Sequence, residues 1–595
     1  MAETSKVLPR QAIGYPGTPL FSLQIDTYGK SSLREKRMLV AGGMLFVCLA
    51  LGLLTYRGPA PLGTDASGNV PSAGRMRQDL NVLLGDPPLQ HSAGTIEGEA
   101  FLDRLERMLA DRGAETKRIE IPFDLSKQDW HPSSRISLLP DDTTLKNLLA
   151  SYPGTDPSLA PILIATHHDS CPWGPGAGDA GSAIVAMTEY ARILGRNPPQ
   201  RTTHFLFTDG EEFGLLGAHA LYAHKALAIS EPAFVLNFDA RGTRGGVPMF
   251  ETYQGNRAAV TTLINELAYP KITTSLAVLI YRSLPNATDF DVFQGNFGWA
   301  GFNFATIGGA EYYHTPQDVP ANLSDRTLQH MGNHVASMHL ALDPLSEEQL
   351  ATFNGDDARR DAVFFDVFGI YVITIEPMTQ LLLAAFSLCL IGLKTIRSSK
   401  ARILRSIPRL FGLAVLVILA SAIIGGISLL VLKMTPYRNL RYTPVDLQAG
   451  LVTVLLALIG TTLLVDKLLS RLFPTDTDLD FVAAVWLATS LLATIVAWLI
   501  PAGGYLLVFP SLIYAVAVNL PRLERLAAWL GWMSFCILLG PTLVLLVQAI
   551  GPWNQPIYAA IAGLLTIPMA AAWIGGQADR SIDNAVKSKV LAEAT

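Results

Sequence analysis

The stretch "THFLFTDGEEFGLLGAH" (203–219) decides the fold. An apolar run ends in an acidic turn that holds the adjacent glutamates Glu211 and Glu212, and a helical pattern follows the turn. A strand, a tight turn and a helix in this order form the unit from which α/β domains are built. Two carboxylates side by side at a strand end repel each other, so the turn also indicates a site that needs both.

The same alternation of strand and helix extends on both sides of this stretch. Strand-like runs are "PILIATHHD" (161–169), "AFVLNFDA" (233–240) and "WAGFNFATI" (299–307), and helical patterns cover 181–194 and 323–342. This order predicts an α/β domain with a mainly parallel mixed sheet that is flanked by helices. Ligands of such sheets bind outside the carboxyl ends of the strands.

Five segments place His, Asp or Glu at that edge of the predicted sheet. They carry His167, His168 and Asp169; Asp179; Asp209, Glu211 and Glu212; Asp239; and His314 with Asp318. Gathered carboxylates raise each other's pKa unless a cation neutralises them, and imidazole with carboxylate suits zinc or a similar divalent ion. The set is larger than one tetrahedral zinc needs, which favours two metals. His167-x-Asp169 and His314-x-x-x-Asp318 further indicate carboxylates that orient a ligating imidazole.

These segments resemble the ordered motifs of the co-catalytic dizinc aminopeptidase family. The matching motifs are "HHDS", "PGAGDAGSA", "DGEEFGLLGAH", "NFDA" and "YYHTPQD", in family order, and the match covers roughly residues 95–345. The family includes bacterial secreted aminopeptidases, glutamate carboxypeptidase and glutaminyl cyclase. An anchor before the domain and several spans after it resemble its endoplasmic reticulum and vacuolar membrane branch.

The resemblance implies a role for each matching residue. Glu211 would be the catalytic general base, and two zinc ions per chain would be held by His167, Asp179 (shared by both), Glu212, Asp239 and His314. Asp169 would lie behind His167, Asp318 would support the loop of His314, and Asp289 in "ATDFDVF" would lie at the substrate pocket. Phe290 and His168 depart from the residues common in the family, which affects the expected substrate but not the ligand set.

The composition of the chain indicates a membrane protein. Half of the 595 residues are hydrophobic and only 16% are charged. The run 38–55 is long enough to cross a bilayer, and seven further candidates lie near 370–393, 410–432, 447–466, 481–500, 503–519, 527–549 and 556–575. Basic residues before the first span and at 394–409 predict that both segments are cytoplasmic, which puts 57–369 on the opposite side.

These features divide the chain into seven expected parts. They are a cytoplasmic tail (1–37), a transmembrane anchor (38–56), a tether (57–95), the zinc peptidase domain (96–345), a linker (346–369), a seven-span membrane domain (370–575) and a cytoplasmic tail (576–595). Cys171 is the one cysteine outside the predicted spans, so no disulfide framework is expected there.

The expected function is a membrane-anchored zinc exopeptidase, an aminopeptidase in the first instance, that acts on the non-cytoplasmic side. The alternatives are a glutaminyl cyclase-like acyltransferase and a binding or transport protein with a vestigial peptidase domain. Expected partners are peptide substrates and membrane lipid, with no nucleic acid, and the membrane domain leaves room for homo-oligomers. The expected location is a bacterial inner membrane facing the periplasm, with an endoplasmic reticulum or vacuolar membrane facing the lumen as the alternative.

Overall fold

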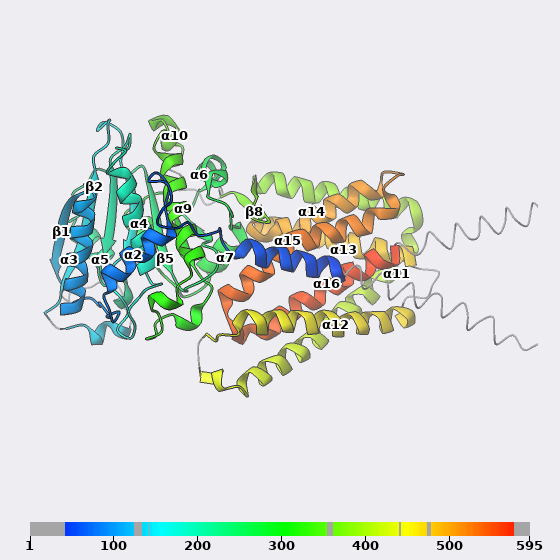
Figure 1. The fold of residues 1–595 in the computed structure, drawn as a ribbon. Coiled ribbons are helices and arrows are strands. Elements are labelled where there is room, and N and C mark those ends of the chain that lie inside the picture. Colours follow the sequence, from blue (N-terminus) through cyan, green and yellow to red (C-terminus); the bar gives the residue numbers. More distant parts are fainter. Residues whose placement is uncertain are drawn as a thin grey trace, which may run out of the picture.

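The computed structural model describes residues 42–123, 134–140, 142–353, 361–439, 442–472 and 478–575. A domain built on a β-sheet lies at one end, and a bundle of long apolar helices extends from it (Figure 1). The predicted tails 1–37 and 576–595 lie outside the described residues, as do the first four residues of the predicted anchor.

The main sheet has seven strands in the order β1-β2-β4-β3-β5-β7-β6. The strands are β1 (Glu115–Pro122), β2 (Thr144–Tyr152), β3 (Ile162–His167), β4 (Thr203–Thr208), β5 (Phe234–Ala240), β6 (Met249–Thr252) and β7 (Gly301–Thr306). The four central strands, β4-β3-β5-β7, are parallel, whereas β1, β2 and β6 pair antiparallel at the two edges. The predicted mainly parallel mixed sheet is therefore confirmed.

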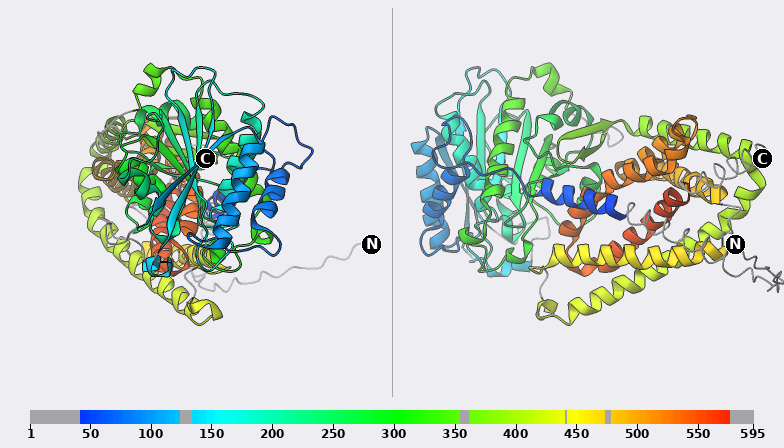
Figure 2. Two further views of the ribbon diagram at one scale, coloured as in Figure 1. Left: turned by 90° about the vertical axis from the view of Figure 1, so that its left-hand side faces the viewer. Right: turned by 45° about the vertical axis from the view of Figure 1, so that its right-hand side comes forward.

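Helices cover both faces of this sheet (Figure 2). The domain contains α2 (Ala73–Leu84), α3 (Ile96–Asp111), α4 (Gly181–Leu194), α5 (Leu216–Ala223), α6 (Arg257–Leu263), α7 (Ser275–Arg282), α8 (Asp289–Gly295), α9 (Asp325–Leu342) and α10 (Glu347–Ala351). Because the central strands are covered on both sides, every residue of β3, β4, β5 and β7 is buried.

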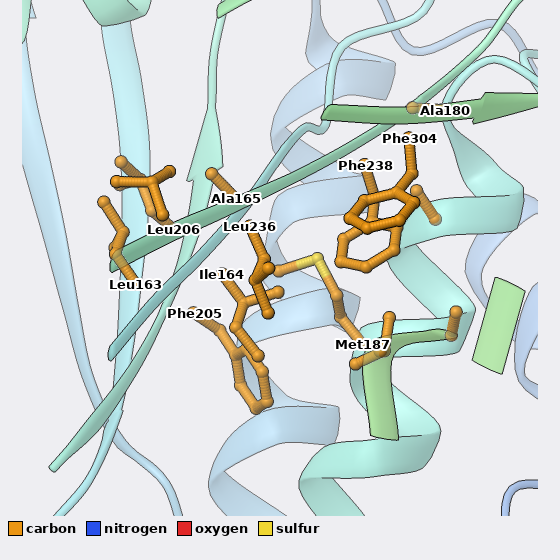
Figure 3. Close-up of a cluster of buried hydrophobic side chains, with 14 of the residues drawn as sticks. Leu163, Ile164, Ala165, Ala180, Met187, Phe205, Leu206, Leu236, Phe238 and Phe304 are labelled. Atoms are coloured by element: carbon orange, nitrogen blue, oxygen red, sulfur yellow. The ribbon is translucent and has the colours of Figure 1, made fainter. Parts of the chain in front are cut away.

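The core between the sheet and α4 shows how the strands are held in register. Ile164 pairs with Phe205 and Leu236 across the sheet, so these three side chains share one face. Figure 3 shows them gathered against Met187 of α4. Phe238 and Phe304 stack on the same face, with their ring centroids 4.8 Å apart. This packing fixes the strand ends that carry the acidic residues.

Among the described residues of the second half, seven helical stretches are long and apolar enough to cross a membrane, as the sequence predicts. These stretches are Pro377–Arg397, Ser406–Lys433, Asp446–Leu468, Asp480–Leu499, Pro501–Val518, Glu524–Ile550 and Gln555–Ala572. The helices that contain them are α11 (Pro377–Lys433), α12 (Asp446–Leu472), α13 (Asp478–Leu499), α14 (Pro501–Val518), α15 (Ala527–Ile550) and α16 (Gln555–Gly575). The apolar helix Gly42–Tyr56, which covers most of the predicted anchor, is shorter.

Two of these seven stretches belong to one helix. The basic segment 394–409 was expected to be a loop, but α11 continues through it and turns back within it (Figure 2). The segment contains no glycine and holds six Lys and Arg residues, which favour a helix.

The predicted tether (57–95) is partly wrong. Its second half forms α2, whose Met76, Leu80, Leu83 and Leu84 are buried in the core of the sheet domain. The helical spacing of these residues is surrounded by Gly- and Pro-rich sequence, and that composition suggested a tether. The sheet domain therefore begins before residue 96.

The predicted linker (346–369) also contains regular structure. It holds α10 and most of a hairpin of β8 (Val363–Val367) and β9 (Tyr371–Ile375), and the first long apolar helix begins only at Pro377. The hairpin packs on the helical half, because Phe365 stacks on Tyr505 of α14 with ring centroids 4.3 Å apart. The connection is thus a packed joint.

Candidate metal centre

The predicted ligands lie at the carboxyl ends of the central strands. His167 ends β3, Asp239 lies in β5, and Glu212 lies in the single 3-10 turn η3 (Glu211–Phe213) that follows β4. Asp179 precedes α4, and His314 follows η5 (Ala310–Tyr312) after β7. Strand β3 has β4 on one side and β5 on the other, so the site lies where the chain changes direction across the sheet.

Two groups of side chains could each hold a metal ion, and Asp179 belongs to both. His167, Asp179 and Asp239 form the first group, and Asp179, Glu212 and His314 form the second; within each group the candidate ligand atoms lie within 4.8 Å of one another.

The two imidazoles point at the carboxylates of these groups. Nε2 of His167 lies 3.1 Å from Asp179 Oδ1 and 3.5 Å from Asp239 Oδ1. Nε2 of His314 lies 3.2 Å from Asp179 Oδ2 and 2.9 Å from Glu212 Oε2. Nitrogen and oxygen atoms that converge in this way form the ligand set expected of zinc.

The turn that carries the two glutamates depends on left-handed backbone at its ends. Gly210 and Gly214 flank η3 with φ of +70° and +112°. Asp169 holds the turn in place, because its carboxylate accepts the N–H groups of Glu211 at 3.0 Å and Glu212 at 3.3 Å. Asp169 Oδ1 also lies 3.6 Å from His167 Nδ1, so one carboxylate contacts a ligand and orients the glutamate pair.

Asp318 contacts a second loop besides the expected loop of His314. Its Oδ1 accepts the N–H of Gly178 at 2.7 Å and its Oδ2 that of Asp179 at 3.2 Å. Asp318 lies four residues after His314, in the turn closed by its own N–H to the carbonyl of Thr315. It therefore fastens the loop of Asp179 to that of His314.

Asp289 is buried behind the site. It begins α8 and accepts a hydrogen bond from the Thr208 hydroxyl at the end of β4. The preceding residue, Thr288, lines the cavity described below, whereas the Asp289 carboxyl is not part of that lining.

The electrostatics of the site match a place for cations. Burial raises the pKa of Glu211 well above its ordinary value, and the negative charge of Asp239 adds to this effect. Burial lowers the pKa of His314, but hydrogen bonds to Asp179 and Glu212 outweigh burial and raise it to about 9. The imidazole thus keeps a proton beside the carboxylates, and a zinc ion would supply the same positive charge.

Arg135 is a site residue that the sequence does not reveal. Its guanidinium pairs with the Glu212 carboxylate and lies 2.9 Å from His314 Nδ1. It also lies over the Trp173 ring, 5.5 Å from the centroid. Arg135 comes before β2 and belongs to no motif, so only the fold brings it to the second metal group.

A cavity of about 350 Å³ opens beside the two groups. Its polar end is lined by Asp179, Glu211, Glu212, Asp239, Tyr313 and His314. Glu211 is in neither metal-binding group found among the described residues, although it lies in the same cavity. The two adjacent glutamates therefore differ: Glu212 belongs to a candidate metal group, and Glu211 lines the same cavity outside both groups.

Fold and site together define an α/β domain that gathers two candidate metal-binding groups at the carboxyl edge of its sheet. Residues 147–339 match the model of Peptidase family M28. This part includes every predicted site residue.

Similar proteins fall into two kinds. A vacuolar membrane protease from Candida albicans (strain WO-1) is 26% identical over 262 residues, which are 43% of this chain and 29% of the relative. Solved structures include a glutaminyl cyclase from Porphyromonas gingivalis (18% identity, 46% of this chain and 98% of that one, TM-score 0.36). A zinc aminopeptidase from Bacillus subtilis is also similar (15% identity, 47% and 97%, TM-score 0.37). The chain spans less than a third of the length of the Candida protein.

Proposed function

We propose that this protein is a membrane-anchored zinc exopeptidase, and specifically an aminopeptidase, that hydrolyses peptide bonds on the non-cytoplasmic side. One observation carries the proposal: Glu211 faces the same cavity as two candidate metal groups that share Asp179 and is not a member of either group. A two-metal peptidase needs two metal-binding sites and a separate general base.

The residues divide the work. His167, Asp179 and Asp239 would hold one zinc, and Asp179, Glu212 and His314 the other. When bound, zinc lowers the pKa of a water molecule and polarises a carbonyl group. Glu211 takes the proton of the attacking water and passes it to the leaving amine. The Asp169 carboxylate accepts the backbone N–H of Glu211 and so holds this residue in place. The Glu211 carboxylate takes no part in that hydrogen bond.

The long apolar helices place this activity at a membrane. Lys394, in the basic segment of α11, pairs with Glu524 at 2.8 Å. α11 turns back at the end of the bundle that lies away from the sheet domain (Figure 2). Basic residues favour the cytoplasmic side, so the sheet domain would face the other way. The vacuolar membrane proteases among the relatives support a vacuolar membrane as the setting, and a bacterial inner membrane is the second setting.

The test is Glu211→Gln in the purified full-length chain, measured for zinc content and for cleavage of a panel of aminoacyl and peptide substrates. We expect about two zinc ions per chain in both proteins and a loss of at least 100-fold in kcat for the variant, because a general base contributes about 10²–10⁴. Glu231→Gln is the matched control, since Glu231 is exposed and remote from the strand ends.

Other outcomes would identify the alternatives. Cleavage by Glu211→Gln at the wild-type rate would remove Glu211 from the mechanism. About one zinc per chain, together with cyclisation of an N-terminal glutamine, would indicate glutaminyl cyclase chemistry. A fully loaded wild-type chain that cleaves nothing in a broad peptide library would indicate a binding or transport protein.

A further inference from the structure

The cavity beside the metal centre has an apolar end, and two parts of the chain build it. We call this end the apolar wall: Leu276, Ala277 and Ile280 come from α7, and Leu545, Leu546 and Ala549 come from α15. α7 belongs to the sheet domain, whereas α15 is one of the seven long apolar helices. The cavity therefore lies between the peptidase domain and the membrane half.

The side of α15 that lines the cavity is a continuous stripe. Thr542, Leu545 and Ala549 follow at spacings of three and four, which puts them on one face of the helix. The opposite end of α15 lies far from the site, because the helix runs lengthwise through the bundle and ends at the sheet domain (Figure 1). Of α15, only residues from Thr542 onward line the cavity.

Direct contacts hold this stripe against the metal centre. The Arg241 guanidinium donates to the Ala549 carbonyl at 2.6 Å and lies over the Tyr442 ring, 5.4 Å from the centroid. Arg241 comes two residues after the candidate ligand Asp239, directly after β5. The end of α15 is therefore tied to the strand that carries a metal ligand.

The other half of the wall is fixed in the same way. Thr274, which caps α7, shares a hydrogen bond with the Tyr505 hydroxyl of α14 at 2.6 Å, and Ser275 donates to the Ala502 carbonyl at 2.8 Å. All four residues belong to the contact between the domain and the bundle. The wall is thus held rigidly with respect to the two metal groups.

We propose that α15 of the membrane half forms part of the substrate pocket. It selects peptides in which the residue that supplies the carbonyl group of the scissile bond carries a large apolar side chain. This inference rests on the proposed peptidase function. A charged side chain at the wall would lose hydration without gaining a partner from α7 or α15 there, whereas an apolar side chain gains from leaving water. The guanidinium of Arg241 is engaged with Ala549 and Tyr442 at the edge of the wall.

The test measures the substrate preference of the full-length, zinc-loaded chain in detergent. Aminoacyl p-nitroanilides of Phe, Leu, Ala, Lys and Glu are compared by kcat/KM for wild type, Leu546→Ala and Ala549→Phe. The wild type should favour Leu and Phe over Ala, Lys and Glu. Leu546→Ala enlarges the pocket and should raise the Phe-to-Leu ratio about tenfold, whereas Ala549→Phe fills it and should lower that ratio about tenfold.

A matched control separates this effect from a general change in the bundle. Leu564→Ala removes the same atoms from α16, where Leu564 is 42% exposed and does not line the cavity. It should leave every ratio unchanged. Zinc content should be the same in all four proteins, which shows that the variants fold around an intact metal centre.

The outcomes are distinct. Cleavage with the same substrate ratios in all variants would overturn the role of α15, and would mean that bilayer lipid or no ligand covers the wall. A wild-type preference for Lys or Glu would also overturn it. If the zinc-loaded wild type cleaves no substrate, the proposed peptidase function fails first and this inference fails with it.

Discussion

At the scale of single residues, the loops that carry the candidate metal ligands are held by carboxylates that bind backbone N–H groups. Asp169 accepts from Glu211 and Glu212, and Asp318 accepts from Gly178 and Asp179. Burial raises the pKa of Asp318 to about 7, although the two N–H groups favour its ionised form. The positions of the ligands thus depend on side chains that touch no metal themselves.

Asp318→Asn should therefore weaken zinc binding without removing a ligand. An amide has one oxygen, so its NH₂ group would face one of the two N–H groups that the carboxylate now accepts. We expect zinc affinity to fall by about 10–100-fold, as is typical when the group that orients a ligand is lost. Competition with a chromogenic chelator measures this change. Asp111→Asn, at the exposed end of α3, should have no effect, and equal affinities in both variants would contradict the orienting role.

Strand-end residues could be predicted from sequence because each follows a short apolar run, and in a parallel sheet all such runs end at one edge. The structure brings His167, Asp179, Glu212, Asp239 and His314 together, as expected. Arg135 could not be found in this way, since it lies outside any strand–helix unit and reaches Glu212 only through tertiary packing. The hydrogen bonds from Asp318 to the loop of Gly178 and Asp179 could not be predicted for the same reason.

At the scale of elements, the turn η3 and helix α5 form one unit with β4. The N–H of Gly217 donates to the Asp209 carbonyl at 2.7 Å, and Asn147 of β2 accepts the N–H of Asp209 at 3.0 Å. A Cβ on Gly217 would lie 2.3 Å from Asn147 Oδ1 and 2.4 Å from the Asp209 carbonyl oxygen. Only glycine allows this close approach between the helix and the strand end.

Gly217→Ala should consequently displace the acidic turn. Overpacking of this kind costs about 1–3 kcal/mol, so the midpoint of denaturant unfolding of the sheet domain should fall and zinc affinity should fall with it. Gly295→Ala is the control, because nothing lies within 4 Å of a Cβ there and alanine suits the end of α8. Unfolding midpoints for Gly217→Ala and Gly295→Ala that do not differ would show that the contact yields easily.

The elements that sequence reasoning missed lie at the joints. The central strands and long helices have strong periodicity, whereas α2 is surrounded by Gly and Pro and the β8-β9 hairpin joins the first long apolar helix. Their places depend on what they pack against: Leu80 and Leu83 on the sheet domain, and Phe365 on Tyr505. Local sequence carries little information about such partners, which explains why a tether and a linker were expected instead.

At the scale of the whole molecule, the two halves are one packed unit around the cavity. The helix Gly42–Tyr56 packs on α15, with Tyr56 in a buried cluster with Val544 and Leu545. A Cβ on Gly52 would lie 2.9 Å from Pro541 Cα, so the two helices approach closely. The short apolar helix Gly42–Tyr56 and α15 thus meet next to the sheet domain, and the orientation of one determines that of the other.

Because the two halves are packed together, labelling of one position in each half tests on which side of the membrane the sheet domain lies. An impermeant thiol reagent applied to sealed right-side-out cells should label Asp111→Cys on the sheet domain and leave Arg397→Cys, near the turn of α11, unlabelled until the membrane is opened. Both positions are exposed, and lie at opposite ends of the molecule. The unmodified chain is the control, since Cys48, Cys171 and Cys536 are buried and Cys389 lies in an apolar stretch.

For an intracellular membrane, sealed vesicles from that membrane should give the reverse pattern, because their outer face is cytoplasmic. Labelling of Arg397→Cys on intact cells would place the basic turn outside and contradict the rule that basic segments stay in the cytoplasm.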